Sequence, residues 1–224
     1  AAHILTFPSG GNAYGVASAD LNEDGKPDLA ITQLTNVSGT DTAFLSIVTG
    51  IGDGTFSVPT SLPLPKQANG QRISPQSVLA ADLTGDKHAD LLVTANERKE
   101  LLLYAGDGHG GFNQPKAIVL SGAPRQLQRA DVDGDGQPDL IVNTSDKALL
   151  VLRAKGDGSF QPEEKYAIGD RVAKDLAIAD VNGDGKPDLV ISLESTNLLQ
   201  AFINDGSGPF GAPIVTKDGV TVAK

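Results

Sequence analysis

Four short segments carry side chains suited to metal binding. Each begins with Asp, has an oxygen-bearing side chain at its third and fifth positions, and ends in Asp-Leu at its ninth and tenth. The segments run over residues 20–29, 82–91, 131–140 and 180–189. Calcium takes six to eight oxygen ligands, and alternate side chains of a curled loop can converge to supply them. The pattern therefore predicts acidic loops that bind Ca²⁺.

Each acidic loop is expected to use the side chains at positions 1, 3, 5 and 9 and the main-chain carbonyl at position 7. Gly25, Gly136 and Gly185 stand at position 6, where glycine permits the sharp bend around an ion. The predicted metal-ligand set comprises Asp20, Asn22, Asp24, Lys26, Asp28, Asp82, Thr84, Asp86, His88, Asp90, Asp131, Asp133, Asp135, Gln137, Asp139, Asp180, Asn182, Asp184, Lys186 and Asp188.

The second loop departs from the other three. It has Thr84 at position 3, Lys87 in place of glycine at position 6, and Ala89 in place of proline at position 8. We expect calcium in the first, third and fourth loops, whereas the second is equally compatible with a filled site and with an empty or weak one.

An EF-hand and a plain hairpin turn are the two alternatives for these segments. An EF-hand requires a bidentate Glu at loop position 12, but that position holds Ile31, Val93, Val142 and Ile191. Plain Asp/Gly hairpin turns would share the composition, but three closely matched loops count against them. The Asp-Gly pairs at 53, 107, 157 and 205 are interpreted as turns only.

The loops recur at intervals that define the elements around them. Their first Asp residues are 62, 49 and 49 residues apart, and a period near 50 suits a propeller blade of four strands. Aliphatic runs follow each loop at 29–32, 91–94, 140–143 and 189–192, and no segment shows helical periodicity. The sequence therefore predicts an all-β fold, a β-propeller of four blades or part of a larger one.

We expect residues 1–224 to form one propeller domain or a propeller fragment. Its repeats are predicted at about 11–63, 75–120, 124–168 and 172–216. Residues 3–7 and 213–223 are expected to be closing or edge strands, with a hairpin reversal at Asp218-Gly219. Other blades or domains of a longer chain are expected partners.

The repeated acidic loop is followed each time by a Gly/Asn-Asp-Gly turn ending in Phe, and the last repeat contains Phe210-Gly-Ala-Pro213. This pattern resembles the FG-GAP/VCBS repeat of integrin α-chain propellers and of many secreted bacterial proteins. The resemblance implies a calcium-bearing propeller in which the ninth-position Asp completes each metal site. It also implies that ligands bind on the rim opposite the calcium loops.

The amino-acid composition counts against several classes of function. Acids outnumber bases 28 to 18, for a net charge of −10, so a nucleic-acid partner is not expected. No apolar run approaches the ~18 residues of a membrane-spanning helix, so we expect no membrane insertion. The three histidines do not adjoin a Ser or Cys nucleophile, and we expect no enzymatic activity. Calcium sites of about 0.1–1 mM affinity fill outside cells, which favours a secreted or cell-envelope location.

The first repeat is longer than the others, with extra residues at 35–43 and 64–74. Both insertions are expected on the rim opposite the acidic loops, where extended loops commonly carry function. The predicted ligand-binding residues are Asp41, Lys66, Gln67, Asn69, Gln71 and Arg72. Simple length variation in solvent-exposed loops accounts for the insertions equally well.

The predicted function is a calcium-stabilised adhesion or recognition module that binds an extracellular protein or glycan. The alternative is the scaffold of a secreted carbohydrate-active enzyme, because some polysaccharide lyases resemble calcium-bearing propellers of this kind.

Overall fold

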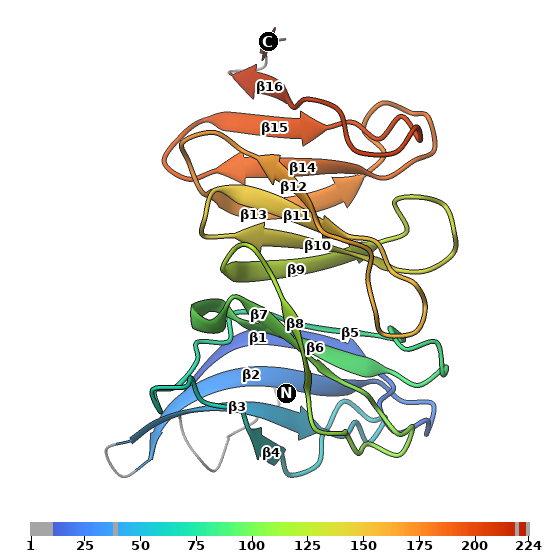
Figure 1. Cartoon of the computed structure of the whole chain (residues 1–224). Helices are drawn as coiled ribbons and strands as arrows, with labels where there is room; N and C mark the ends of the chain where they lie inside the picture. The colour runs from blue at the N-terminus through green and yellow to red at the C-terminus, as the bar shows by residue number, and fades with distance from the viewer. Residues whose placement is uncertain (1–10, 38–39, 218–219, 223–224) are drawn as a thin grey trace. The chain divides into compact units, whose positions relative to one another are not determined.

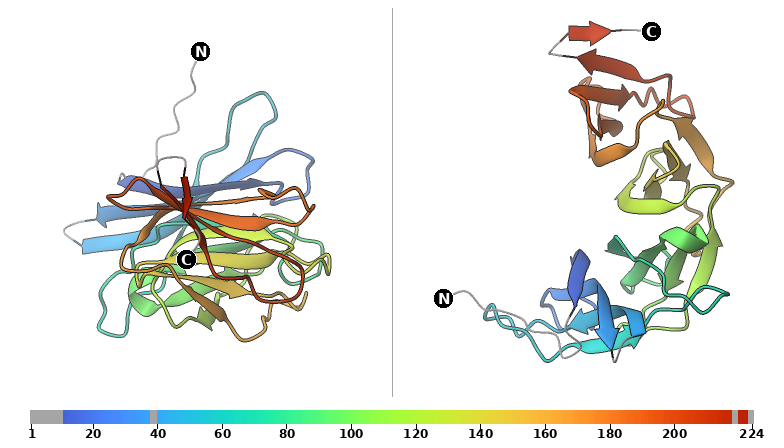
Figure 2. Two further views of the ribbon diagram at one scale, coloured as in Figure 1. Left: turned by 90° about the horizontal axis from the view of Figure 1, so that it is seen from above. Right: turned by 90° about the vertical axis from the view of Figure 1, so that its left-hand side faces the viewer.

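A computed structural model describes residues 11–37, 40–217 and 220–222, which form seventeen β-strands and one short 3-10 helix. The strands build four antiparallel sheets, and within each sheet strands adjacent in sequence are adjacent in space (Figure 1). Figure 2 shows the same strands in two further views, coloured along the chain as in Figure 1. The expected all-β architecture of propeller-type blades is thereby confirmed.

The first two sheets are made from consecutive segments. Sheet 1 contains β1 (Asn12–Ala19), β2 (Asp28–Val37), β3 (Thr40–Val48) and β4 (Thr60–Pro63). Sheet 2 contains β5 (Val78–Ala81), β6 (Asp90–Ala95), β7 (Glu100–Tyr104) and β8 (Lys116–Val119), and the 3-10 helix η1 (Asn96–Arg98) joins β6 to β7.

The last two sheets repeat this arrangement. Sheet 3 contains β9 (Pro124–Ala130), β10 (Asp139–Thr144), β11 (Ala148–Leu152) and β12 (Glu164–Ala167). Sheet 4 contains β13 (Ala173–Ala179), β14 (Asp188–Leu193), β15 (Leu198–Phe202), β16 (Ile214–Lys217) and β17 (Val220–Val222). In all four sheets the acidic loop connects the first strand to the second.

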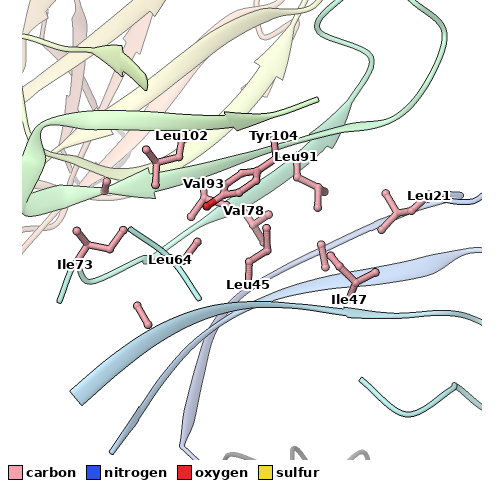
Figure 3. Close-up of a cluster of buried hydrophobic side chains, with 13 residues drawn as sticks. Leu21, Leu45, Ile47, Leu64, Ile73, Val78, Leu91, Val93, Leu102 and Tyr104 are labelled. Carbon is pink, nitrogen blue, oxygen red and sulfur yellow. The ribbon is translucent and has the colours of Figure 1, made fainter. Parts of the chain in front are cut away.

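The chain divides into two compact units, Ala1–Ala123 and Pro124–Lys224, and each has its own hydrophobic core. In the first unit, fully buried Leu45 of β3 packs with Val78 and Leu91 of sheet 2 (Figure 3). Leu21, at position 2 of the first acidic loop, is 3% exposed and belongs to the same core. The core thus fixes one end of the acidic loop.

The second unit has an equivalent core with an aromatic cluster. Val132, at position 2 of the third acidic loop, is buried there beside Phe202 and Phe210. The Tyr166 ring packs edge-to-face on both phenylalanines, with ring centroids 5.9 and 5.7 Å away. Such edge-to-face contacts add to the stabilisation from burial alone.

Of the extra residues, 35–37 and 40–43 extend β2 and β3 instead of lengthening the loop between them, so that detail of the prediction is wrong. Val37 pairs with Thr40 across the hairpin, and pairing continues without a register shift to Leu29 and Val48. The insertion is rich in β-branched residues, which favour extended strands.

Closing or edge strands are expected at both ends of the chain. The expected strand at 3–7 lies outside the described residues. The expected reversal at 218–219 also lies outside them, but the flanking strands β16 and β17 pair antiparallel. No helix in the described part of the chain is long and apolar enough to cross a membrane.

Replacing Leu45 by Ala tests the first core. We expect the free energy of unfolding to fall by about 2–5 kcal/mol, because the substitution removes buried methyl groups and leaves a cavity. Val58 is 80% exposed, and Val58→Ala is the matched control with an expected change within about 0.5 kcal/mol. Chemical denaturation measures both; equal effects would contradict the assignment of this core.

Candidate metal centre

The ninth-position Asp of every acidic loop is a buried hydrogen-bond acceptor. Asp28, Asp90, Asp139 and Asp188 are 0–1% exposed. In each, Oδ2 accepts the N–H of the position-2 residue at 2.8–3.0 Å. Oδ1 accepts an N–H from just beyond the third strand at 2.7–3.0 Å. These donors are Gly50, Gly106, Ala154 and Asn204. Each carboxylate therefore joins its acidic loop to the turn after the third strand.

This pair of hydrogen bonds, which we call the Asp clamp, offsets the cost of burying a carboxylate. Burial raises the pKa of Asp139, while the N–H groups of Ala154 and Val132 act to lower it. A nearby cation would favour the charged form further.

The first-position Asp organises the interior of each loop. Oδ2 of Asp20, Asp82, Asp131 and Asp180 accepts the N–H of the position-6 residue at 2.8–2.9 Å. For Asp180, the N–H groups of Gly185 and Gly183 hold the carboxyl pKa below its usual value. The loops are therefore closed by their own backbone donors, with carboxylate oxygens at the centre.

Position 6 has a positive φ in all four loops. The φ angles are 82°, 86° and 85° at Gly25, Gly136 and Gly185, and 75° at Lys87. Lys87 thus adopts the left-handed conformation that glycine adopts elsewhere, at a cost of roughly 1–2 kcal/mol. The missing glycine does not prevent the second loop from folding like the others.

Position 3 is where the second loop differs in hydrogen bonding. Asn22, Asp133 and Asn182 each accept the N–H of the position-5 residue at 2.9–3.3 Å. The Oγ1 atom of Thr84 is buried and has no hydrogen-bond partner. The second loop therefore lacks the position-3 hydrogen bond that the other three loops make.

The third loop brings three predicted metal ligands together. One carboxylate oxygen from each of Asp131, Asp133 and Asp139 lies within 4.8 Å of the others. Calcium–oxygen distances of about 2.3–2.6 Å allow ligands on opposite sides of one ion to be about 5 Å apart. The donor set consists of hard oxygens, so these residues fit calcium in both spacing and chemistry.

The remaining predicted ligands are not gathered in this way. Among the described residues, no other group of three acidic or histidine side chains is this close. Asp135 lies outside the third-loop trio, and its Oδ1 accepts the N–H of Gln137 at 2.7 Å. At position 7, the Lys26 Nζ lies 3.4 Å from Asp24, and the Lys186 Nζ donates to the carbonyl of Asp205.

His88 links the second loop to the first. Its Nδ1 is 2.5 Å from Oε1 of Glu23, and the hydrogen bond to Glu23 is the largest cause that raises the pKa of His88. The N–H of Gly110 also donates to the carbonyl of Leu21 at 3.0 Å. The acidic-loop ends of sheets 1 and 2 therefore lie side by side.

A cleft of about 270 Å³ lies at this end of the first unit. Its walls mix polar and apolar groups: Asn22, Asp28, Ile47, Thr49, Thr60, Leu62 and the turn at 109–112. The sequence did not reveal this cleft, because the turn at 109–112 is separated from the rest of the wall by about fifty residues. No local pattern marks such a site.

Five of the six predicted ligand-binding residues lie in one compact loop at 64–74. Leu64 and Ile73 anchor the loop in the core. The Gln67 N–H donates to the carbonyl of Gln71 at 2.8 Å, and the Gln67 Nε2 donates to the carbonyl of Arg72 at 2.9 Å. Of the five predicted residues, Lys66, Asn69 and Gln71 are exposed.

The same loop is tied to sheet 2 at the end opposite the acidic loops. The N–H of Ser74 donates to Glu97 at 2.8 Å, and the Arg98 Nη1 donates to the carbonyl of Lys66 at 3.0 Å. Asp41, the sixth predicted residue, lies on β3, and its side chain is outside what the structure describes.

A family model for the FG-GAP-like repeat matches residues 82–142 and 131–191. The chain contains FG-GAP-like repeats. The two matches overlap at the third acidic loop and span three of the four loops, so the resemblance inferred from the acidic loops is confirmed. No curated protein matches the sequence significantly.

Solved propeller structures resemble the chain in fold. One is an Agrocybe aegerita lectin, described for specific recognition of non-reducing terminal N-acetylglucosamine. It has a TM-score of 0.56 and 21% identity, over 95% of this chain and 67% of the lectin. Another is BBS1N in complex with ARL6DN, with a TM-score of 0.51 and 12% identity over 92% of this chain and 67% of BBS1N. At these identities the likeness shows the fold alone.

Substitutions of Asp139 test whether the Asp clamp is structural. Asp139→Ala leaves two buried N–H donors unpaired, so we expect the free energy of unfolding to fall by about 2–6 kcal/mol. Asp139→Asn keeps one acceptor oxygen and should cost about half as much. Denaturation in excess EDTA measures this without a metal contribution.

Asp135→Ala is the control, because Asp135 is an exposed carboxylate of the same loop. We expect it to cost less than about 1 kcal/mol. If Asp139→Ala were no more destabilising than Asp135→Ala, the Asp clamp would have no structural role.

Proposed function

We propose that this chain is a calcium-stabilised extracellular recognition module that binds glycan or protein. The observation that supports this most directly is the convergence of Asp131, Asp133 and Asp139 within 4.8 Å, in a loop built like the other three. These three side chains would hold the ion, with further ligands from the loop carbonyls or water. When bound, calcium supplies charge neutralisation to the loop.

The physical argument rests on like-charge repulsion. Two carboxylates about 4 Å apart repel by about 4 kcal/mol at an effective dielectric constant near 20. A divalent cation replaces this repulsion with attraction to each carboxylate. Because Val132 of the same loop lies in the core, a fixed loop also restrains the packing of sheets 3 and 4.

The proposed cellular location follows from the calcium affinity expected of such sites. Calcium sites in extracellular modules bind at about 10⁻⁴–10⁻³ M, and they are filled where calcium is abundant. We therefore place the module outside the cell or in the cell envelope.

The recognition role is supported by fold-level likeness and by surface features. Propellers of this fold include a lectin and a protein solved in complex with another protein. The loop at 64–74 presents exposed polar side chains on a frame anchored by Leu64 and Ile73. We propose that this loop contacts the ligand and that the module itself is not catalytic.

Calcium titration tests the first part of the proposal. We expect isothermal titration to detect binding near 0.1–1 mM, and excess calcium to raise the melting temperature. At 100 times the dissociation constant, each filled site adds about 2.7 kcal/mol to the free energy of unfolding. Asp131→Asn/Asp133→Asn should lose part of this binding. No heat of binding, together with a melting temperature unmoved by EDTA, would overturn the proposal.

A glycan array tests the second part. The triple variant Lys66→Ala/Asn69→Ala/Gln71→Ala changes only exposed side chains and is expected to reduce glycan binding at least tenfold. The comparison variant Thr49→Val/Thr60→Val removes two hydroxyls from the cleft and is expected to bind normally. The reverse result would move the binding surface to the cleft. If the ligand is a protein, a pull-down with the same two variants makes the same comparison.

A further inference from the structure

The third acidic loop has one more carboxylate at its ligand positions than the first and fourth. Position 3 is Asp133 in the third loop, whereas it is Asn22 in the first and Asn182 in the fourth. By charge alone, the third loop should bind calcium most tightly, because ligand charge count is a main determinant of affinity.

In the third repeat a buried cation, Arg153, stands beside this extra acid. Arg153 is the residue just before Ala154, which donates to the clamp carboxylate of Asp139. The corresponding residues in the other repeats, each just before its clamp donor, are Thr49, Ala105 and Ile203. An added Asp and an added Arg therefore occur together in one repeat.

The Arg153 guanidinium is buried and points at the loop. The residue is 7% exposed, and its Nη1 lies 3.5 Å from Oδ2 of Asp133. Its Nε donates to Oε1 of Glu164 at 2.7 Å, and its Nη2 donates to the carbonyl of Gly208 at 3.1 Å. Asp133 is thus shared between the candidate metal trio and a buried cation.

Arg153 is held in place by partners other than Asp133. Glu164 also accepts a hydrogen bond from the Tyr166 hydroxyl, which in turn accepts the N–H of Phe210 at 3.0 Å. Burial first, and the hydrogen bond to Glu164 second, raise the pKa of Tyr166 to about 12, so its hydroxyl keeps the proton it donates. An ion entering the loop would therefore meet a fixed positive charge.

We propose that Arg153 sets the calcium affinity of the third loop by offsetting the additional charge of Asp133. With Arg153 counted, the four ligand-position acids of the third loop leave three net negative charges, the number of ligand-position acids in the first and fourth loops. The first and fourth loops also carry the partly exposed Lys26 and Lys186 at position 7, where the third has Gln137, and these lysines are outside this count. In the metal-free loop Arg153 also relieves repulsion among Asp131, Asp133 and Asp139. This proposal rests on the proposed calcium binding, and it assigns a residue that the loop motif does not contain.

The experiment isolates the third loop in the full chain. Asp20→Asn/Asp82→Asn/Asp180→Asn removes the first-position carboxylate from the other loops, and calcium is then titrated calorimetrically. Adding Arg153→Ile/Glu164→Gln introduces the aliphatic residue found at 203 and avoids leaving Glu164 unpaired. We expect the calcium association constant of this combined variant to be about tenfold higher than that of the background, the triple variant Asp20→Asn/Asp82→Asn/Asp180→Asn.

Two controls separate charge from packing. Glu164→Gln alone keeps Arg153, and we expect no increase in calcium affinity. Arg153→Lys keeps a positive charge without the planar guanidinium, and it should raise the affinity less than Arg153→Ile/Glu164→Gln. Melting temperatures in EDTA confirm that each variant is folded, and the gain in melting temperature with calcium gives a second readout of affinity.

The outcomes distinguish the two proposals. If the wild-type chain binds no calcium, the proposed function fails and this inference fails with it. If wild type binds calcium but Arg153→Ile/Glu164→Gln matches Glu164→Gln within twofold, only the role of Arg153 is overturned. If the triple variant Asp20→Asn/Asp82→Asn/Asp180→Asn binds no detectable calcium, recovery of calcium binding on adding Arg153→Ile/Glu164→Gln supports the proposal. Continued absence of calcium binding overturns it.

Discussion

The structure depends on one buried interaction repeated four times, the Asp clamp. A carboxylate with almost no solvent exposure accepts one N–H from its own acidic loop and another from the turn beyond the third strand. Burying a charged group without such partners would be strongly unfavourable. Because Asp139 and its counterparts satisfy these donors directly, each loop has a defined shape from protein contacts alone.

A calcium ion bound as we propose would act on the charge of the loop more than on its chain path. The second loop illustrates the distinction, because Lys87 adopts the same left-handed backbone as the glycines while Thr84 lacks the hydrogen bond made at position 3 elsewhere. The third loop shows the opposite case, with three convergent carboxylates and a buried Arg153 beside them. Different residues thus set the loop shape and the charge around the candidate metal site.

At the end of the first unit opposite the acidic loops, the two insertions differ in the structure they adopt. In the insertion at 35–43, residues 35–37 and 40–43 became strand, because β-branched residues there suit an extended hairpin. The insertion at 64–74 became a loop whose polar groups largely satisfy one another while Leu64 and Ile73 hold it to the core. An anchored loop of this kind can present exposed side chains such as Lys66 with little loss of conformational freedom on binding.

The sequence by itself determined the repeat, the strands beside each loop and the acidic positions, because these depend on spacing and on local preferences of Asp, Gly and aliphatic residues. It could not show that the ninth-position Asp is a buried acceptor as well as a candidate metal ligand. Nor could it place Arg153 against Asp133 and Gly208, or close the cleft with the turn at 109–112. Those contacts join residues about 15 to 90 positions apart, and only strand register and the packing of one sheet on the next bring them together.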